Sequence, residues 1–512
     1  MRKTILSLLA VIFLTLGHCF LSLNTVSAQD LHFRMGEETN KKAYDASRIH
    51  IAEGMQETQL LVVEPVLKAV SGPFSNPVKS IKVRLCDIEW NDSKSVTLDN
   101  SKKNTIYDAF RIGNRFHVLI GANEEKSLTL RHVTLDAQDL DIVGDNPLVD
   151  SPLPKGSESY LWTVCSPNGQ YRGVVYAIWG DNGNSKAMAM MFDREMNKLW
   201  ERPLAYSDVF NVIATDEGAI VTLRLGMVED NESLTAFRIN MATASGEKHG
   251  EYVLDADVSD PALVGCDGSR VLVLTLEGKG GYGAIRFGSL GGRDYSGIYG
   301  LVFDLDQQKI TIANRHPFTD EELRILANDD KGQTYSHREI EFMRKLDDCQ
   351  TSAGGAALYQ HAWSVETRHI RSGMTSTTVY SQGILLVQST MDGVLTINGI
   401  PQNNQNADWP PVGADLLVHG GNLYVVTNES KEASDIYTPD EPAQRSKSLV
   451  FANTALAVYW FSPDGQGAKK VVEKDRKAVL ATPLAGDGDR FYFLTKGGIY
   501  PYISSLTLPS AR

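Results

Sequence analysis

Short apolar strands that follow a glycine turn recur along this chain. Glycine fits the positive φ of a tight turn, and apolar residues that alternate or run together are typical of strands. Seven such units occur, at Arg111–Ile120, Ser166–Trp179, Thr215–Leu225, Cys266–Leu276, Ser381–Gln388, His419–Thr427 and Gly486–Thr495. Each unit predicts a turn that leads into a buried strand.

The spacing of these units is nearly regular at first. The turn glycines Gly113, Gly169, Gly218 and Gly268 lie 56, 49 and 50 residues apart. A period of about 50 residues that holds several strands has the size of a propeller blade. Further strands are expected after the units, at Lys186–Phe192, Ser233–Ile239, Ile298–Phe303, Lys309–Ala313 and Leu456–Phe461.

A four-stranded sheet cannot bury both faces alone, but it can when it is packed radially between two neighbours. We therefore predict an all-β fold, a β-propeller over residues 105–512 with seven blades. Six or eight blades, or tandem β-sandwiches, are the alternatives that the pattern leaves open.

The last unit is short of an outer strand, because the chain ends soon after Tyr500-Pro-Tyr-Ile503. A ring of similar blades needs a device that fastens its two ends. We expect the N-terminal segment, residues 29–104, to supply a ring-closing strand from within 59–70 or 79–90.

One stretch breaks the rhythm, since 115 residues separate Gly268 from Gly383. We predict a helical insertion there, over about 318–350. Thr319 with Glu322, and Ser336 with Glu339, have the spacing of capping boxes and predict the starts of two short helices. In the second helix, apolar residues would share one face: Ile340, Met343 and Leu346.

Two turns support the repeat interpretation. Ser166-Pro-Asn-Gly169 and Ser462-Pro-Asp-Gly465 are similar to turns of β-propeller repeat proteins in general. The resemblance extends from about residue 105 onward, but the WD dipeptide and a full kelch pattern are absent. It implies a scaffold and no particular function.

The start of the chain predicts export. Arg2 and Lys3 precede an almost wholly apolar run, 5–16, and the sequence at 26–28 has the small-x-small pattern of a signal peptidase site. We expect residues 1–28 to be a cleaved signal peptide and the protein to be periplasmic, cell-surface or secreted. A membrane anchor and a lipid attached at Cys19 are the rival interpretations.

Charge and cysteine usage exclude some function classes. With 50 basic and 63 acidic residues the net charge is −13, which disfavours a nucleic-acid partner. Beyond the predicted signal there are four cysteines, far apart in the sequence and without a CxxC motif, so we expect no zinc site. Unpaired thiols are favoured, and three disulfide pairings stay open for Cys86, Cys165, Cys266 and Cys349.

The first candidate for ligand binding is a glycine-rich segment. Gly278-Lys-Gly-Gly-Tyr-Gly283 matches GxGxxG, but the residues that follow lack the helical period that a dinucleotide site needs. We interpret 278–297 as a long loop between strands, either solvated or ligand-binding. Its candidate ligand-binding residues are Arg286, Arg293, Asp294 and Tyr295.

Other candidates are weaker. Trp409 lies in a loop rich in amides and would suit carbohydrate stacking, or it fills a gap between blades. His361 and His369 would face one side of a long strand, although a structural role is favoured over metal binding. Neither Asp181–Asn184 nor Asp464-Gly465 has the spacing of a calcium loop. No GxSxG or HExxH motif occurs, and we predict neither a metal nor a cofactor.

These observations favour an exported, non-enzymatic binding or interaction protein of the cell envelope, with a protein or glycan partner. One alternative is a propeller enzyme, a hydrolase or lyase that acts on polysaccharide through carboxylates from several blades. The other is a structural subunit of an envelope assembly.

Overall fold

A computed structural model describes residues 31–509 apart from 19 segments. The undescribed parts within that range are 39–48, 57–58, 68–77, 100–103, 124–126, 181–184, 229–230, 280–293, 327–342, 369–374, 402–403, 408–413, 431–432, 438–453, 464, 474–478, 481–485, 487 and 497–500.

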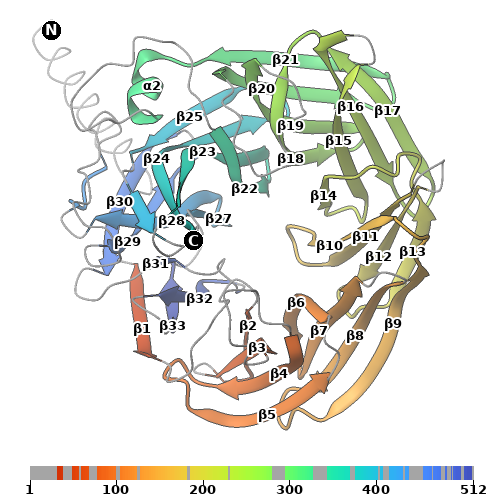
Figure 1. The fold of residues 1–512 in the computed structure, drawn as a ribbon, viewed down its shortest axis with the longest axis vertical. Coiled ribbons are helices and arrows are strands. Elements are labelled where there is room, and N and C mark those ends of the chain that lie inside the picture. The colour runs from red at the N-terminus through yellow and green to blue at the C-terminus, as the bar shows by residue number, and fades with distance from the viewer. Residues whose placement is uncertain are drawn as a thin grey trace, which may run out of the picture.

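Eight antiparallel sheets are arranged radially about a central axis, and each is one blade of a β-propeller (Figure 1). The blades are numbered along the chain. Blade 1 holds β2 (His50–Glu53), β3 (Leu60–Leu67), β4 (Val78–Cys86) and β5 (Asp92–Asp99), and blade 2 holds β6 (Asn104–Ile112), β7 (Arg115–Asn123), β8 (Ser127–Asp136) and β9 (Ile142–Pro152). Blade 3 holds β10 (Glu158–Cys165), β11 (Tyr171–Trp179), β12 (Lys186–Asp193) and β13 (Lys198–Pro203), and blade 4 holds β14 (Asn211–Ala214), β15 (Ile220–Val228), β16 (Asn231–Ala242) and β17 (Glu247–Leu254).

The second half of the ring follows the same order. Blade 5 holds β18 (Val258–Asp267), β19 (Arg270–Lys279), β20 (Asp294–Asp304) and β21 (Lys309–Pro317), and blade 6 holds β22 (Met343–Thr351), β23 (Gly354–Arg368), β24 (Thr375–Thr390), β25 (Leu395–Ile400) and β26 (Asn404–Ala407). Blade 7 holds β27 (Ala414–His419), β28 (Asn422–Ser430), β29 (Thr454–Phe461) and β30 (Gly467–Glu473). Blade 8 holds β31 (Val479–Leu480), β32 (Arg490–Lys496), β33 (Pro501–Thr507) and β1 (His32–Glu38).

The all-β propeller is therefore confirmed, but with eight blades where seven were predicted. The blade missing from the prediction is blade 1. Its first two strands are joined by a turn closed from Gly54 N to Gln59 O at 2.7 Å, which is longer than the glycine turns used as the repeat signal. Segment 59–70 contains β3 of this blade and segment 79–90 contains most of β4, so neither closes the ring.

The ring is closed by β1, which is the outer strand of blade 8. It pairs antiparallel with β33, with His32 opposite Thr507 and Arg34 opposite Ser505. Strands from the two ends of the chain thus share one sheet (Figure 1). This pairing satisfies backbone groups of β33 that an open sheet edge would leave to solvent.

The turn glycines of the first four units have the predicted conformation, with φ of 55° at Gly113, 68° at Gly169, 75° at Gly218 and 57° at Gly268. The fifth unit was misinterpreted. Gly383 lies inside β24, where a Cβ would collide with the carbonyl oxygen of Ile325. It is glycine because a neighbouring backbone approaches it closely.

That neighbouring backbone belongs to α2 (Asp320–Leu326). Its predicted capping box is present, because Thr319 N donates to Glu322 Oε2 at 2.7 Å and Glu322 N donates to Thr319 Oγ1 at 3.2 Å. Ser336 and Glu339 lie outside the described residues. Met343, however, lies in β22, so the prediction of a second helix is wrong from Met343 onward. These residues are extended because they pair with β23.

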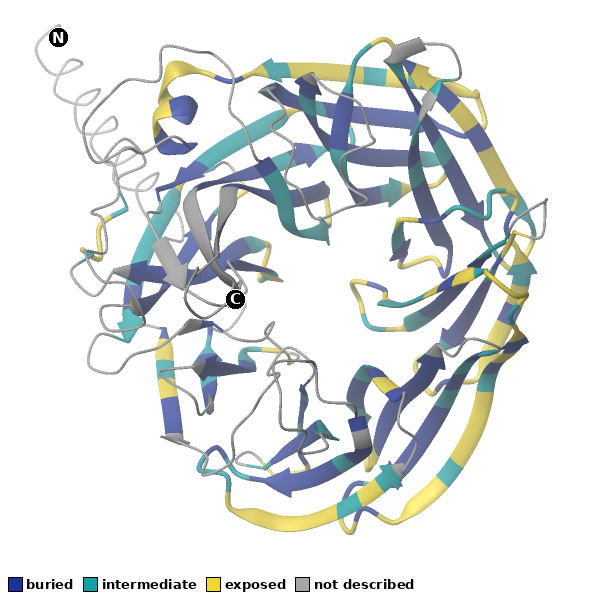
Figure 2. Cartoon of the chain, viewed as in Figure 1, coloured by how far each residue is buried: buried dark blue, intermediate teal, exposed yellow. Residues whose placement is uncertain are grey.

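Each interface between neighbouring blades has its own apolar cluster, eight in all among the described residues. Between blades 4 and 5, the rings of Phe237 and Phe303 lie 5.0 Å apart. Burial of one such side chain stabilises the fold by about 1.5–3 kcal/mol. Exposed positions concentrate on the outer strands, such as β5 and β9 (Figure 2).

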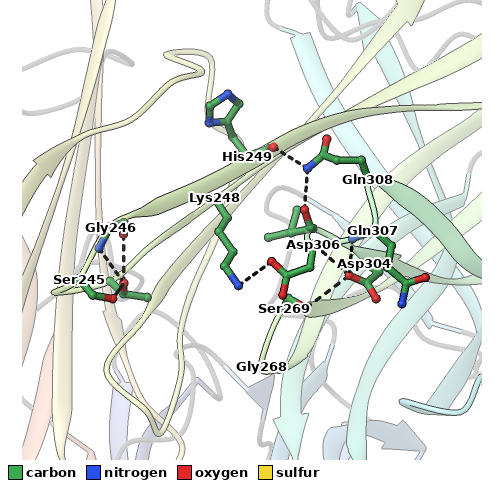
Figure 3. A network of polar contacts seen from close by, with 12 residues as sticks. Ser245, Gly246, Lys248, His249, Gly268, Ser269, Asp304, Asp306, Gln307 and Gln308 are labelled. Atoms are coloured by element: carbon green, nitrogen blue, oxygen red, sulfur yellow. Dashed lines mark hydrogen bonds and ion pairs between the residues drawn. The ribbon is translucent and has the colours of Figure 1, made fainter.

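Polar contacts join the outer parts of blades 4 and 5 (Figure 3). Lys248 Nζ lies 2.8 Å from Asp306 Oδ1, and Gln308 Nε2 donates to His249 O at 3.1 Å. Asp304 Oδ1 accepts the N–H of Asp306 at 2.9 Å, which fixes the turn between β20 and β21. Exposed ion pairs contribute little, so the apolar cluster dominates this interface.

The four cysteines beyond the predicted signal form no disulfide with one another. Burial raises the pKa of the Cys86 and Cys266 thiols to about 12, which keeps both in the unreactive thiol form at neutral pH. Within the described part of the chain, no helix has the length and hydropathy needed to cross a membrane.

Candidate functional site

An aromatic platform lies where blades 3 and 4 meet. Its members are Tyr160 and Trp162 of β10, Trp179 of β11, and Phe210, which directly precedes β14. Ring centroids are 4.3 Å apart for Tyr160 and Trp179, 5.4 Å for Trp179 and Phe210, and 6.0 Å for Tyr160 and Trp162. These distances are those of interacting aromatic pairs.

Strand register explains why the platform forms. Glu158 lies opposite Trp179 in the β10–β11 ladder, and side chains two residues apart on a strand share one face. Glu158, Tyr160, Trp162 and Trp179 are therefore on the same face of blade 3. The connection from β13 to β14 brings Phe210 against this face.

The platform is exposed although it is aromatic. Tyr160 is 38% exposed and Phe210 is 47% exposed, while Trp162 and Trp179 are partly buried. Hydrogen bonds hold two of the rings in place, because Trp179 Nε1 donates to Ser207 O at 2.9 Å and Tyr160 Oη donates to Glu158 Oε2 at 2.9 Å. A fixed, solvent-facing aromatic surface is a feature of binding sites.

Charged groups border the platform on the blade 4 side. The guanidinium of Arg224 lies 5.8 Å from the centre of the Phe210 ring and forms an ion pair with Asp208. Arg238 is 3.5 Å from the same carboxylate and 2.8 Å from Glu251. The apolar rings are thus flanked by groups that can hydrogen-bond a polar ligand.

A polar strip extends from this point toward blade 6. Lys345 Nζ of β22 donates to Asn211 Oδ1 of β14 at 3.1 Å and pairs with Asp348. Gln350 Nε2 donates to Ala214 O at 2.8 Å. Side chains of β22 therefore reach across blade 5 to β14, and the strip meets the platform at Asn211, the neighbour of Phe210.

The strip ends in a carboxyl pair. Asp347 of β22 is hydrogen-bonded to Asp415 of β27, and its two oxygens also accept N–H groups from Asp348 at 2.9 Å and Leu416 at 2.8 Å. Burial, followed by the nearby Asp415 carboxylate, raises the pKa of Asp347 well above its ordinary value. The pair joins the inner strands of blades 6 and 7.

Its spacing limits its chemistry. Two-carboxylate glycoside hydrolysis requires carboxyl groups separated by about 5–5.5 Å or by about 6.5–9.5 Å. A direct hydrogen bond between two carboxyls leaves no space for the scissile bond that this mechanism places between them. With backbone N–H groups on both Asp347 oxygens, the pair has the contacts of a structural link between blades.

The residues predicted from sequence lie elsewhere or outside the described residues. Arg286, Arg293 and Trp409 are in undescribed segments, as are His369 and the 181–184 turn. Asp294 begins β20 and pairs with Lys279, the last residue of β19. Both ends of the loop predicted over 278–297 therefore belong to strands.

Tyr295, the remaining predicted residue, is 4% exposed and belongs to the apolar cluster between blades 5 and 6. Its hydroxyl is 3.5 Å from Ser259 Oγ. His361 is also buried, and its Nδ1 donates to Leu326 O at 2.7 Å. Among the described residues, no group of three or more His, Cys, Asp or Glu side chains is placed to hold a metal ion.

The platform was not predicted from the sequence. One signal was available, because Tyr160 and Trp162 are two apart and follow Glu158 on an alternating strand. The contributions of Trp179 and Phe210 depend on strand register and on a connection between blades, neither of which the sequence states directly.

The fold and site define an eight-bladed β-propeller with an aromatic platform between two blades. No protein-family model matches the chain, and no curated protein matches its sequence.

Solved structures similar to it include the Dos1 propeller, at 8% identity and TM-score 0.40, over 93% of this chain and 95% of that one. Another is the β-propeller domain of the Trilobed protease from Pyrococcus furiosus, at 12% identity and TM-score 0.35, over 84% and 98%. A third is a mutant of the Synechocystis apocarotenoid oxygenase, at 10% and 0.34, over 94% of each chain. Similarity this low does not extend to what those proteins bind or catalyse.

Proposed function

We propose that this protein is an exported, non-enzymatic binding protein of the cell envelope, and that its ligand is a glycan held on the aromatic platform. The observation that carries the proposal is the exposed, mutually packed set of Tyr160, Trp179 and Phe210. The signal-like sequence at 1–28 supports export.

A carbohydrate suits this surface because a sugar ring has both apolar C–H faces and polar hydroxyl edges. An aromatic face covers the former, while flanking charged and amide groups hydrogen-bond the latter. Here Glu158, Asp208 and Arg224 are the flanking groups. The acidic net charge disfavours a nucleic acid as the stacked ligand.

Binding without cleavage is favoured over the alternative of a polysaccharide hydrolase. The carboxyl pair of Asp347 and Asp415 is directly hydrogen-bonded, which leaves no space between its members for the scissile bond of the two-carboxylate mechanism. It is also already engaged by backbone N–H groups. These contacts support a structural role for the pair.

A glycan array tests the proposal. The mature protein is applied to neutral and acidic oligosaccharides, and each bound glycan is then incubated with the protein and assayed for new reducing ends or unsaturated products. We expect retention of at least one glycan class with no cleavage. Retention on no glycan would contradict the ligand assignment, and cleavage would contradict the non-enzymatic assignment.

A further inference from the structure

A cavity lies at the seam where the ring closes, between blade 8 and blade 1. Its volume is about 290 Å³, near the lower end of the range for small-molecule sites. The described residues that line it come from β1, β32 and β33 on one side and from Leu60 and Ile88 of blade 1 on the other. The aromatic platform, between blades 3 and 4, is a separate place in the ring (Figure 1).

Strand register lines up the polar groups of this cavity in two rows. Paired residues of adjacent strands lie side by side, and positions two apart on a strand share a face. The β1–β33 and β33–β32 ladders therefore place two sets of three side chains on one face of blade 8: His32, Thr507 and Arg490, and then Arg34, Ser505 and Tyr492.

The chemistry of these rows favours an anion. The lining holds two arginines and a histidine, and none of the described lining residues is acidic, although the chain as a whole has an excess of acidic residues. At the rim, Arg34 Nη2 contacts Glu89 Oε1 at 2.7 Å. A guanidinium has five N–H donors, so this ion pair engages only part of the group.

The remaining lining groups favour a ligand with hydroxyls. Ser505, Thr507 and Tyr492 supply hydroxyl groups that can both donate and accept. Leu60 and Ile88 form an apolar wall that would pack against the carbon skeleton of such a ligand. Guanidinium groups recognise carboxylate and phosphate oxygens through charge-assisted hydrogen bonds.

We propose that the seam cavity binds a small hydroxylated oxyanion of monosaccharide size, either a sugar carboxylate or a sugar phosphate. The ligand contacts all three strands that close blade 8, together with blade 1. Because a ligand that binds only the folded state stabilises it, occupancy strengthens the ring closure.

Thermal unfolding of the mature protein tests this with four probes at matched ionic strength: glucuronate, glucose 6-phosphate, inorganic phosphate and glucose. We expect at least one sugar anion to raise the unfolding temperature by about 2 °C or more at saturation, and glucose to leave it unchanged. Hydrogen exchange in the presence of that anion should slow in β1 and β33.

Matched variants locate the effect. R490Q removes a cavity guanidinium and should abolish the rise, whereas R131Q removes an arginine paired with Asp145 in blade 2 and should retain it. If R490Q does not fold, S505A serves as the second cavity variant and should weaken the rise. No rise with either sugar anion, an equal rise with glucose, or a rise that survives in the cavity variants would overturn the proposal. If inorganic phosphate raises the unfolding temperature as much as the sugar anions do, the assignment of a sugar ligand is overturned.

Discussion

At the scale of single residues, two side-chain pairs respond to pH in opposite directions. Asp347 is hydrogen-bonded to Asp415 and has a raised pKa, whereas His117 has a lowered one and lies 2.8 Å from His132 between ring nitrogens. The first pair joins blades 6 and 7, and the second lies in blade 2. Each pair therefore links protonation to the stability of the ring.

Replacing Asp347 should change how stability depends on pH. Burial, followed by the nearby Asp415 carboxylate, raises the pKa of Asp347 well above its ordinary value. Its protonation therefore stabilises the folded state fully below that ordinary value, and the contribution is lost as pH rises through the folded pKa. D347N keeps a neutral side chain. We expect its unfolding temperature, relative to wild type, to increase as pH rises above about 4 and to level off once pH passes the folded pKa.

The exposed carboxylate of Asp145 gives the control for that measurement, since D145N removes a surface ion pair with Arg131. Its difference from wild type should lack the rising trend. Asn cannot accept both backbone N–H groups that Asp347 accepts, so D347N should also change the unfolding temperature by an amount that does not depend on pH. The measured quantity is therefore the change of the difference with pH. A pH-independent difference for D347N would contradict the raised pKa.

Acid should weaken the fold through His117. Burial, then the neighbouring His132 and two arginines, lowers the pKa of His117 from 6.5 to about 4. The unfolded chain therefore binds the proton more tightly, and stability falls as pH drops from 6.5 through 4. In thermal melts over this range, H117Q should lose less stability than wild type does. The exposed His249 supplies the control H249Q, which should follow wild type; an H117Q curve parallel to wild type would refute the assignment.

At the scale of elements, glycines mark two different demands on the backbone. Gly113 and Gly268 form turns at positive φ, whereas Gly383 allows the backbone of α2 to lie against β24. Only the first demand creates a recurrent turn. The two kinds of glycine look alike in the sequence, and Gly383 was therefore predicted to lie in a blade turn.

Gly383→Ala is expected to destabilise the protein, because its Cβ would meet a backbone carbonyl that cannot move without shifting α2. The loss should be about 1–3 kcal/mol in the free energy of unfolding, measured by chemical denaturation. Gly246 is the matched control: a Cβ there meets nothing within 4 Å, so G246A should change stability by no more than about 0.5 kcal/mol. Equal effects would argue against the close packing of α2.

At the scale of the whole molecule, the sequence was informative about local pattern and poor about pairing. Strands such as 186–192 and 298–303 were predicted because apolar alternation is local. The identity of the closing strand was not, because β1 and β33 are separated by nearly the whole chain. Blade 1 was missed because its first turn is not a tight glycine turn.

The same distinction holds for the candidate sites. Tyr160 and Trp162 share a strand, so their alternation was visible, but the platform also needs Phe210 from the next blade. The seam cavity needs residues from both ends of the chain, as His32 and Thr507 demonstrate. Tyr295 was chosen for its place in a glycine-rich segment, yet it packs in a core, because β20 begins one residue earlier.

The affinity of the platform for one glycan tests the account most directly. Using the glycan retained best on the array, calorimetry would compare wild type, F210A and V253A, the last of which shortens an exposed apolar side chain on the outer strand β17. The account predicts that F210A weakens binding about tenfold or more, equivalent to about 1.4 kcal/mol, and that V253A binds as wild type does. Equal affinity of all three proteins would contradict glycan binding on the aromatic platform.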